Sequence, residues 1–236
     1  NSGFTANWVG DVDKLNVYTK AETEVLNQDI TNASLNVWRS YVNDYTTKWL
    51  YGLKGDMDYN LHAIYGFQVS STGSSWAYLY TPQIGKMLAG VTANTEIEVT
   101  IEAYCYNTAN KIKCFVIDGE PTNNTFPQSG NMVTINGGSA NSWTSELLPI
   151  PAYTEVSFRV SGLTSTSRIA ITALNASKTT YIKTVKISSV ATSSEGTYSV
   201  TGTNYEVSDL SPNTTYYYTV TDGSSNTSNE IAVTTY

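Results

Sequence analysis

The sequence has little charge, only one histidine and only two cysteines, and these shortages exclude several classes of protein. Of the 236 residues 14% are charged, and 20 acidic against 13 basic side chains give a formal net charge of −7. Nucleic-acid binding is excluded, because it requires clustered lysine and arginine. The single histidine, His62, excludes zinc sites built from several histidines. His62 alternates with apolar neighbours, so we expect a solvated or hydrogen-bonded side chain.

Long apolar runs are also missing. No window approaches the ~18 uncharged apolar residues that a membrane-spanning helix needs. No leader with basic, apolar and small-residue regions is recognisable, so we expect any signal peptide to be absent from this sequence. The length suits one large domain or two unequal ones.

What the sequence does contain is typical of an all-β protein. It has 18 Tyr, 5 Trp and 34 Thr, and these residue types suit a pleated, half-buried surface. Stretches of Asn, Ser, Thr and Gly between the apolar segments supply turns. Uncharged polar surfaces of this kind are common in secreted proteins.

Alternation of apolar and polar residues predicts strands directly. The clearest run is 96–106, in which Ile97, Val99, Ile101, Ala103 and Cys105 point to the core and the residues between them point outward. A turn at 107–110 and a second alternating run at 111–117 follow. This pattern predicts a β-hairpin with its register set by the alternation.

Similar patterns recur along the first 190 residues. About ten strands separated by turns indicate a two-sheet sandwich or jelly roll. Only 20–27 and 84–88 could form a helical turn or two. The other predicted strands cover residues 4–9, 35–42, 46–53, 61–70, 76–81, 154–160, 168–173 and 181–190.

The composition changes after Val190. Residues 191–196 are small and polar, and we interpret them as a domain boundary. Three strands are predicted beyond it, at 204–210, 215–221 and 230–235. The expected domains are therefore 1–190, a jelly-roll sandwich, and 191–236, a small β unit.

The tail carries the first resemblance. Leu210-Ser-Pro212-Asn-Thr-Thr-Tyr216-Tyr-Tyr-Thr-Val220 resembles the E–F corner of a fibronectin type III domain. The resemblance implies a tyrosine whose hydroxyl bonds back to the backbone at the corner. Such a domain needs about 90–100 residues, so 191–236 resembles only its later half.

The second resemblance covers about residues 60–190. Gly66-Phe-Gln-Val69, Trp76-Ala-Tyr-Leu-Tyr-Thr-Pro82 and Glu96-Ile-Glu-Val-Thr-Ile101 resemble the jelly-roll modules of secreted Bacteroidetes proteins, as does the closing strand 181–187. Those modules are similar to galactose-binding-like and carbohydrate-binding-module sandwiches. The resemblance implies a non-catalytic, extracellular module. Relatives often carry paired aspartates in the closing strand, whereas this chain has Lys183 and Thr184.

Aromatic side chains are the first predicted ligand-binding residues. Trp76, Tyr78 and Tyr80 share one face of a predicted strand. Their spacing of about 7 Å suits stacking on neighbouring sugar rings. The alternative is that these rings fill the core or lie under a loop.

Three further aromatics complete the predicted ligand-binding set. Tyr104 and Tyr106 share the polar face of their strand with Glu98 and Glu102, where carboxylates could accept sugar hydroxyls. The alternative is an exposed sheet face with Glu–Lys pairs to Lys111 and Lys113. Trp143 lies in a Ser/Asn-rich stretch and is the best candidate for an exposed loop tip.

Metal binding and cysteine chemistry are weakly indicated. Asp11 and Asp13 are two apart and could contribute to a calcium site, which needs six to eight oxygen ligands. No other cofactor is expected. Cys105 and Cys114 could form a cross-strand disulfide if the hairpin pairs them directly, or remain two buried thiols.

The sequence thus predicts a non-catalytic, secreted or cell-surface module that binds a polysaccharide or host glycan. The alternative is a structural spacer or adhesion module that contacts other extracellular proteins and has no small ligand. A glycosidase would need two carboxylates about 5–9.5 Å apart in a cleft, and we expect none. Stacking requires two or three aromatics open to solvent, whereas a spacer leaves them buried.

Overall fold

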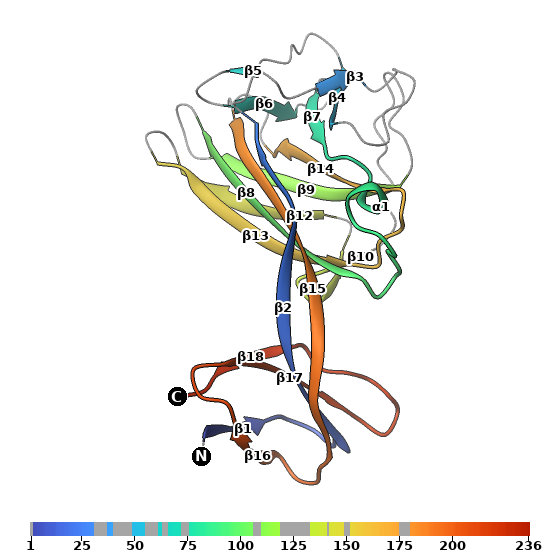
Figure 1. Cartoon of the computed structure of the whole chain (residues 1–236), viewed down its shortest axis with the longest axis vertical. Helices are drawn as coiled ribbons and strands as arrows, with labels where there is room; N and C mark the ends of the chain where they lie inside the picture. The colour runs from blue at the N-terminus through green and yellow to red at the C-terminus, as the bar shows by residue number, and fades with distance from the viewer. Residues whose placement is uncertain are drawn as a thin grey trace. The chain divides into compact units, whose positions relative to one another are not determined.

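The computed structural model describes residues 2–30, 37–39, 49–54, 61–62, 66–71, 76–105, 110–118, 133–140, 142–148, 152–174 and 180–236 (Figure 1). The described chain is almost entirely β. Its one helix, α1 (Ile84–Met87), is a single turn. No helix in these residues is long and apolar enough to cross a membrane.

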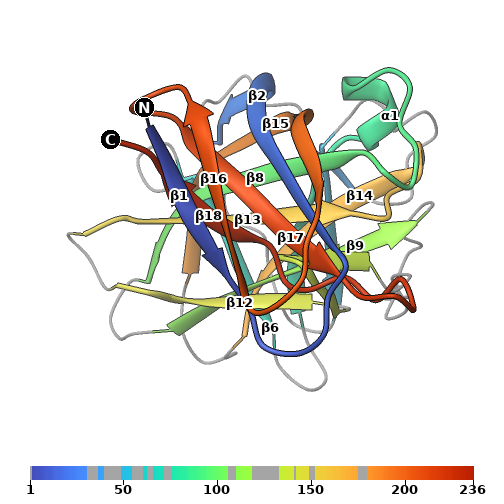
Figure 2. The ribbon, with the colours of Figure 1, turned by 90° about the horizontal axis from the view of Figure 1, so that it is seen from below.

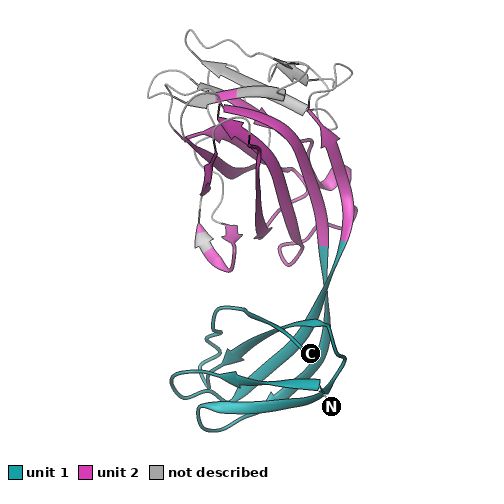
Figure 3. Cartoon of the chain, turned by 90° about the vertical axis from the view of Figure 1, so that its left-hand side faces the viewer, with its two compact units in different colours: residues 1–22, 190–236 teal, residues 23–189 magenta. Residues whose placement is uncertain are grey.

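The chain divides into two compact units (Figure 3). Unit 1 comprises residues 1–22 and 190–236, and unit 2 comprises residues 23–189. The strands are β1 (Ser2–Asn7), β2 (Lys14–Asp29), β3 (Val37–Arg39), β4 (Trp49–Lys54), β5 (Leu61–His62), β6 (Gly66–Ser71), β7 (Trp76–Tyr80), β8 (Glu96–Cys105), β9 (Asn110–Asp118), β10 (Val133–Ile135), β11 (Gly138–Ala140), β12 (Ser142–Leu147), β13 (Thr154–Ser161), β14 (Ser167–Ala173), β15 (Thr180–Ser199), β16 (Asn204–Leu210), β17 (Thr215–Thr221) and β18 (Ile231–Thr234).

Unit 2 is a jelly-roll β-sandwich. One layer, the β8 sheet, has the order β11-β10-β13-β8-β15. The other, the β14 sheet, has the order β12-β9-β14-β7, with β4 beyond β7. Strand β6 pairs with both β15 and β7 and so joins the layers at one side.

The core of unit 2 lies between these sheets, and alternation explains it. In β8 the residues Ile97, Val99 and Ile101 are fully buried, as predicted. In β14 the inward residues are Ile169 and Ile171, which belong to the same apolar cluster. Burial of apolar surface stabilises a folded protein by about 25 cal/mol per Å². This cluster is therefore the main source of the stability of unit 2.

The predicted hairpin between 96–106 and 111–117 is wrong. Strand β8 pairs with β13, with Val99 opposite Phe158. Strand β9 pairs with β14 and β12, in the other layer. Both strands turn an apolar face inward, and alternation identifies that face without identifying the neighbouring strand.

Unit 1 has its own sheets and core. One sheet is β1-β16, and in the other β2 pairs with β15 and β17, and β17 pairs with β18. The buried residues of unit 1 are Ala6, Leu15, Val17, Val200, Val207, Tyr216, Tyr218 and Val220. The Tyr216 hydroxyl accepts a hydrogen bond from the Ser211 backbone N–H at 3.0 Å.

The structure divides the chain differently from the expected domains 1–190 and 191–236. Residues 1–22 belong to unit 1, where Phe4 of β1 pairs with Val207 of β16. The expected boundary at 191–196 lies inside β15, and the expected helical turns at 20–27 lie inside β2. Pairing between residues about 200 positions apart leaves no local signal in the sequence.

Candidate functional site

A separate buried cluster, which we call the aromatic cluster after its three rings, lies on the outer face of the β14 sheet, turned away from the main core. Its members are Tyr78, Tyr80, Phe115, Ile117 and Ala170. Register brings them together, because Ala170 of β14 lies opposite Tyr80 on one side and Phe115 on the other. The Tyr78 and Tyr80 rings are 6.2 Å apart and nearly parallel, and Phe115 meets Tyr78 edge-on at 5.7 Å.

Arg168 adds a buried charge to the same face. It lies two residues before Ala170 in β14 and is fully buried. Its Nη1 donates to the Thr81 carbonyl at 2.6 Å. The Thr81 hydroxyl in turn accepts from the Ile169 backbone N–H at 3.0 Å. A buried guanidinium is costly to desolvate, and the hydrogen bond to Thr81 offsets part of that cost. In the sheet Arg168 lies opposite Ile117, a member of the cluster.

The rim of this face is polar and open. Thr144 of β12 lies opposite Lys113 of β9 and is exposed, whereas Lys113 is half-buried. Lys111 and Glu146 form an ion pair of 2.6 Å next to them. We call this set of residues, together with the aromatic cluster and Arg168, the β14 outer face.

Tyr78 and Tyr80 share a face, as predicted, and both are buried, which is the alternative that the sequence left open. Tyr78 is 5% exposed and Tyr80 is 0% exposed. Burial raises the pKa of the Tyr80 hydroxyl, which has no hydrogen-bond partner among the residues that the structure describes. The Trp76 side chain lies outside the described residues, although its backbone belongs to β7.

Tyr104 is also buried rather than open. Its ring stacks on Tyr181 at 5.4 Å and meets Tyr153 edge-on at 4.9 Å. It therefore packs among neighbouring aromatics instead of facing a ligand. Tyr106, the other residue predicted with it, lies outside the described residues.

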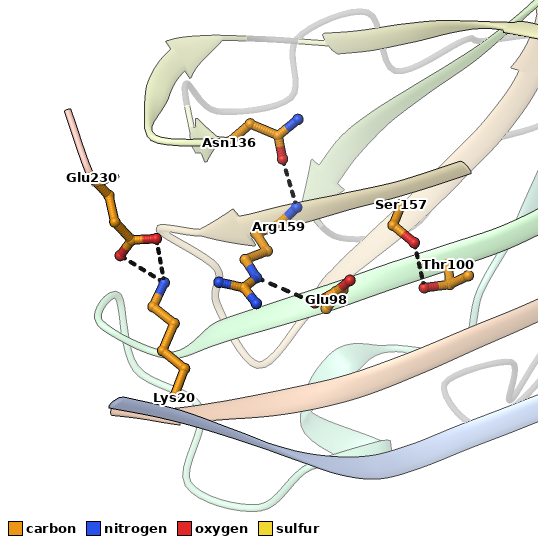
Figure 4. A network of polar contacts seen from close by, with 7 residues as sticks. All are labelled: Lys20, Glu98, Thr100, Asn136, Ser157, Arg159 and Glu230. Carbon is orange, nitrogen blue, oxygen red and sulfur yellow. Dashed lines mark hydrogen bonds and ion pairs between the residues drawn. The ribbon is translucent and has the colours of Figure 1, made fainter. Parts of the chain in front are cut away.

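The expected Glu–Lys pairs between 96–106 and 111–117 do not form, because the two strands lie in different sheets. Glu98 instead binds Arg159 Nε at 3.2 Å, and Thr100 bonds Ser157 at 2.8 Å (Figure 4). Glu102 binds Lys183 Nζ at 3.0 Å. These contacts tie β8 to β13 and β15 on the outer face of the β8 sheet.

Trp143 is not at a loop tip. It belongs to β12, lies opposite Cys114 and so faces inward. The ring is half-buried and stacks on Phe158 at 4.7 Å. Its Ser/Asn-rich neighbours suggested a loop, but the aromatic ring closes the edge of the core.

The structure shows where the possible calcium ligands and the two cysteines lie. Asp11 and Asp13 are exposed in the segment before β2. Among the described residues no group of three or more His, Cys, Asp or Glu side chains could hold a metal ion. The calcium site at Asp11 and Asp13 gains no support from this search and stays a prediction. Cys105 and Cys114 are buried, and burial raises the pKa of the Cys114 thiol.

Sequence reasoning missed Phe115 and Arg168. Both alternate with core residues, so their outward direction was readable from the pattern. Their burial was not, because a two-residue period says which face a side chain lies on and nothing about what covers that face.

Comparisons with known proteins give likenesses to solved structures and no family. No protein-family model matches the chain, and no curated protein matches it. Among solved structures the chain is similar to the CBM22-1 xylan-binding domain from Paenibacillus barcinonensis Xyn10C. The two share 10% sequence identity with a TM-score of 0.46, over 72% of this chain and 97% of that chain.

Proposed function

We propose that unit 2 is a non-catalytic carbohydrate-binding module of a secreted or cell-surface protein. The carrying observation is the β14 outer face, where three aromatic rings and an arginine gather apart from the sandwich core. Tyrosine faces stack on the apolar faces of sugars, and a guanidinium donates several hydrogen bonds to oxygen acceptors. A polysaccharide or host glycan is the ligand class that uses both.

Binding at this face requires it to open. Tyr78 and Tyr80 are buried, so a sugar ring can stack on them only after a rearrangement that uncovers them. The exposed rim at Thr144 and the half-buried Lys113 are the first side chains that an arriving glycan meets. Stacking interactions then offset the cost of opening.

The first test is glycan binding by the intact chain and its Tyr78→Ala variant. We expect the unchanged chain to bind at least one member of a panel of xylan, β-glucan, mannan and host-type glycans. Tyr78→Ala should weaken that binding about tenfold or more, because it removes one stacking surface and its edge-on contact with Phe115. Isothermal titration calorimetry on the folded proteins measures the dissociation constants of the unchanged chain and of the variant.

Tyr153→Ala is the matched control. Tyr153 is an aromatic residue on the outer face of the opposite sheet, where it contacts Tyr104. Its removal should leave the affinity within about twofold of the unchanged chain. Equal weakening by both variants would indicate a general loss of structure and would contradict a site at the β14 outer face.

A structural spacer or adhesion module is the second candidate function. It is favoured by the burial of Tyr78, Tyr80 and Tyr104, which a module without a small ligand would show. Absence of binding to the whole panel by a folded chain would support this candidate. Other extracellular proteins would then be the partners.

We further propose that unit 1 is a fibronectin type III-like sandwich into whose sequence unit 2 is inserted, starting within β2 and ending within β15. The order β15-β2-β17-β18 facing β1-β16 supports this. So does the hydrogen bond from the Ser211 N–H to the Tyr216 hydroxyl, which has the form of a tyrosine corner. Such sandwiches are frequent in cell-surface proteins, which agrees with an extracellular location.

Tyr216→Phe tests this corner. The substitution keeps the ring but removes the acceptor of the Ser211 N–H, so we expect unit 1 to lose about 1 kcal/mol of stability. Urea denaturation followed by aromatic fluorescence measures the change. Tyr217→Phe, on the neighbouring residue of the same strand, provides the comparison, and a loss no larger than that of Tyr217→Phe would contradict the corner.

A further inference from the structure

Strand β1 has a free edge. Among the described residues it pairs only with β16, in a two-stranded sheet (Figure 2). Its six residues span about 20 Å at ~3.3 Å per residue. They contain no proline and no charged side chain. Proline and charged side chains are the usual features that prevent another strand from pairing with an edge.

Strand β18 presents apolar side chains that its own unit leaves partly uncovered. Ile231 lies opposite Tyr218, and Val233 lies opposite Tyr216. Directly opposed residues share a face of the sheet, so both point inward with the buried tyrosines. Yet Ile231 is 44% exposed and Val233 is half-buried.

The free edge and these apolar residues belong to the same side of unit 1. Phe4 of β1 stacks on Tyr218 at 5.5 Å, next to Ile231 in the sheet. The Ser2 hydroxyl donates to the carbonyl of Tyr236, two residues after β18 ends. A strand added beside β1 would therefore lie over the inner face of β18 and cover Ile231 and Val233.

The charge of unit 1 indicates which strand would bind. Residues 1–22 and 190–236 contain eight acidic side chains and two lysines, so this unit holds −6 of the formal charge of −7. Two copies of such a unit repel one another, whereas a basic segment is attracted. A strand whose apolar side chains alternate with lysine or arginine matches the apolar residues and the charge together.

We propose that the free edge of β1 binds an extended, basic segment of a partner protein by strand addition. Main-chain hydrogen bonds to β1 would supply affinity, and alternate apolar side chains over Ile231 and Val233 would supply register. The lysine or arginine side chains of the segment would be attracted by the net negative charge of unit 1. This interaction surface is independent of the glycan site proposed for unit 2.

The test uses the full chain and the synthetic peptide KVTVKVTVK, whose valines occupy one face. We expect measurable binding by fluorescence anisotropy, weakened at least fivefold when the salt concentration rises from 50 to 500 mM. The analogue EVTVEVTVE should bind at least tenfold more weakly. Hydrogen exchange on the unchanged chain should show new protection at amides of β1.

Ile231→Lys should weaken peptide binding at least tenfold, because it places a cation where the apolar side chains pack. Ala232→Lys is the matched control: Ala232 is exposed on the opposite face of the same strand, and its replacement should change affinity by less than twofold. Absence of binding by the unchanged chain, equal effects of the two variants, or protection outside β1 would overturn the proposal. So would a dimer of the unliganded chain held through β1, detected by light scattering.

Discussion

Replacing Arg168 by alanine is expected to lower the free energy of unfolding of unit 2 by about 3 kcal/mol. Arg168 is fully buried beside the aromatic cluster. Its removal leaves the Thr81 carbonyl without the donor that now lies 2.6 Å away, and an unsatisfied buried acceptor costs about 1–3 kcal/mol. The lost side chain also leaves a cavity next to Ala170, which adds to the cost.

Two companion variants separate these causes. Arg168→Met restores much of the volume and avoids burying a charge, so it should cost only about 1 kcal/mol. Arg168→Lys keeps the charge but loses the planar donor group, so its free energy of unfolding should lie nearer to that of the alanine variant. The midpoints of chemical denaturation curves give the free energy changes of all three variants, provided that the slopes of the curves stay constant. An alanine variant within about 0.5 kcal/mol of the unchanged chain would contradict a structural role for the guanidinium.

The same series bears on function. A buried arginine retained for stability alone can be replaced by methionine with little consequence for a ligand. An arginine that donates to a glycan cannot, because methionine offers no donor. If the unchanged chain binds a glycan, the affinity of that glycan for a folded Arg168→Met chain therefore tells whether the arginine contacts the ligand, in a variant whose fold is largely preserved.

The faces of individual strands were predictable from the sequence. The alternation from Ile97 to Cys105 placed every second residue inward, and the structure buries those residues. The bounds of β16 and β17 were predicted as they are found. A two-residue period is a local property, and the pleat of a strand converts it directly into two faces.

The neighbours of each strand were not predictable in the same way. Strands β8 and β9 follow one another in sequence yet lie in opposite layers, since an inward apolar face suits either sheet of a sandwich. The pairing of Phe4 with Val207 joins segments about 200 residues apart. No turn signal links such segments, so the first 22 residues could not be assigned to unit 1 from pattern alone.

The candidate site shows the same limit at the level of single side chains. Tyr78 and Tyr80 were placed on the correct shared face, but the pattern left both exposure and burial open, and burial is found. Burial of an outward face depends on packing beyond the strand itself, which residue alternation does not encode. Trp143 shows the same limit, because its polar neighbours suggested an exposed loop while its ring packs on Phe158.

Because the two units have separate cores, Ile171→Ala and Leu15→Ala are expected to lower the free energy of unfolding of different units. Ile171 is fully buried in the core of unit 2, and Leu15 is fully buried in the core of unit 1. Each truncation removes buried methyl groups and leaves a cavity, at a cost of about 3 kcal/mol. Because no residue belongs to both clusters, we expect two unfolding transitions, each shifted by only one of the variants.

Differential scanning calorimetry resolves the two transitions, and Ile171→Val is the conservative control with a cost of about 1 kcal/mol. Strands β2 and β15 contribute residues to both units, so these strands are the route by which unfolding of one unit could reach the other. A single transition that both alanine variants lower equally would mean that the strands couple the units into one cooperative structure. In that case unit 2 would not be an independent insertion, and ligand binding to unit 2 would stabilise the whole chain.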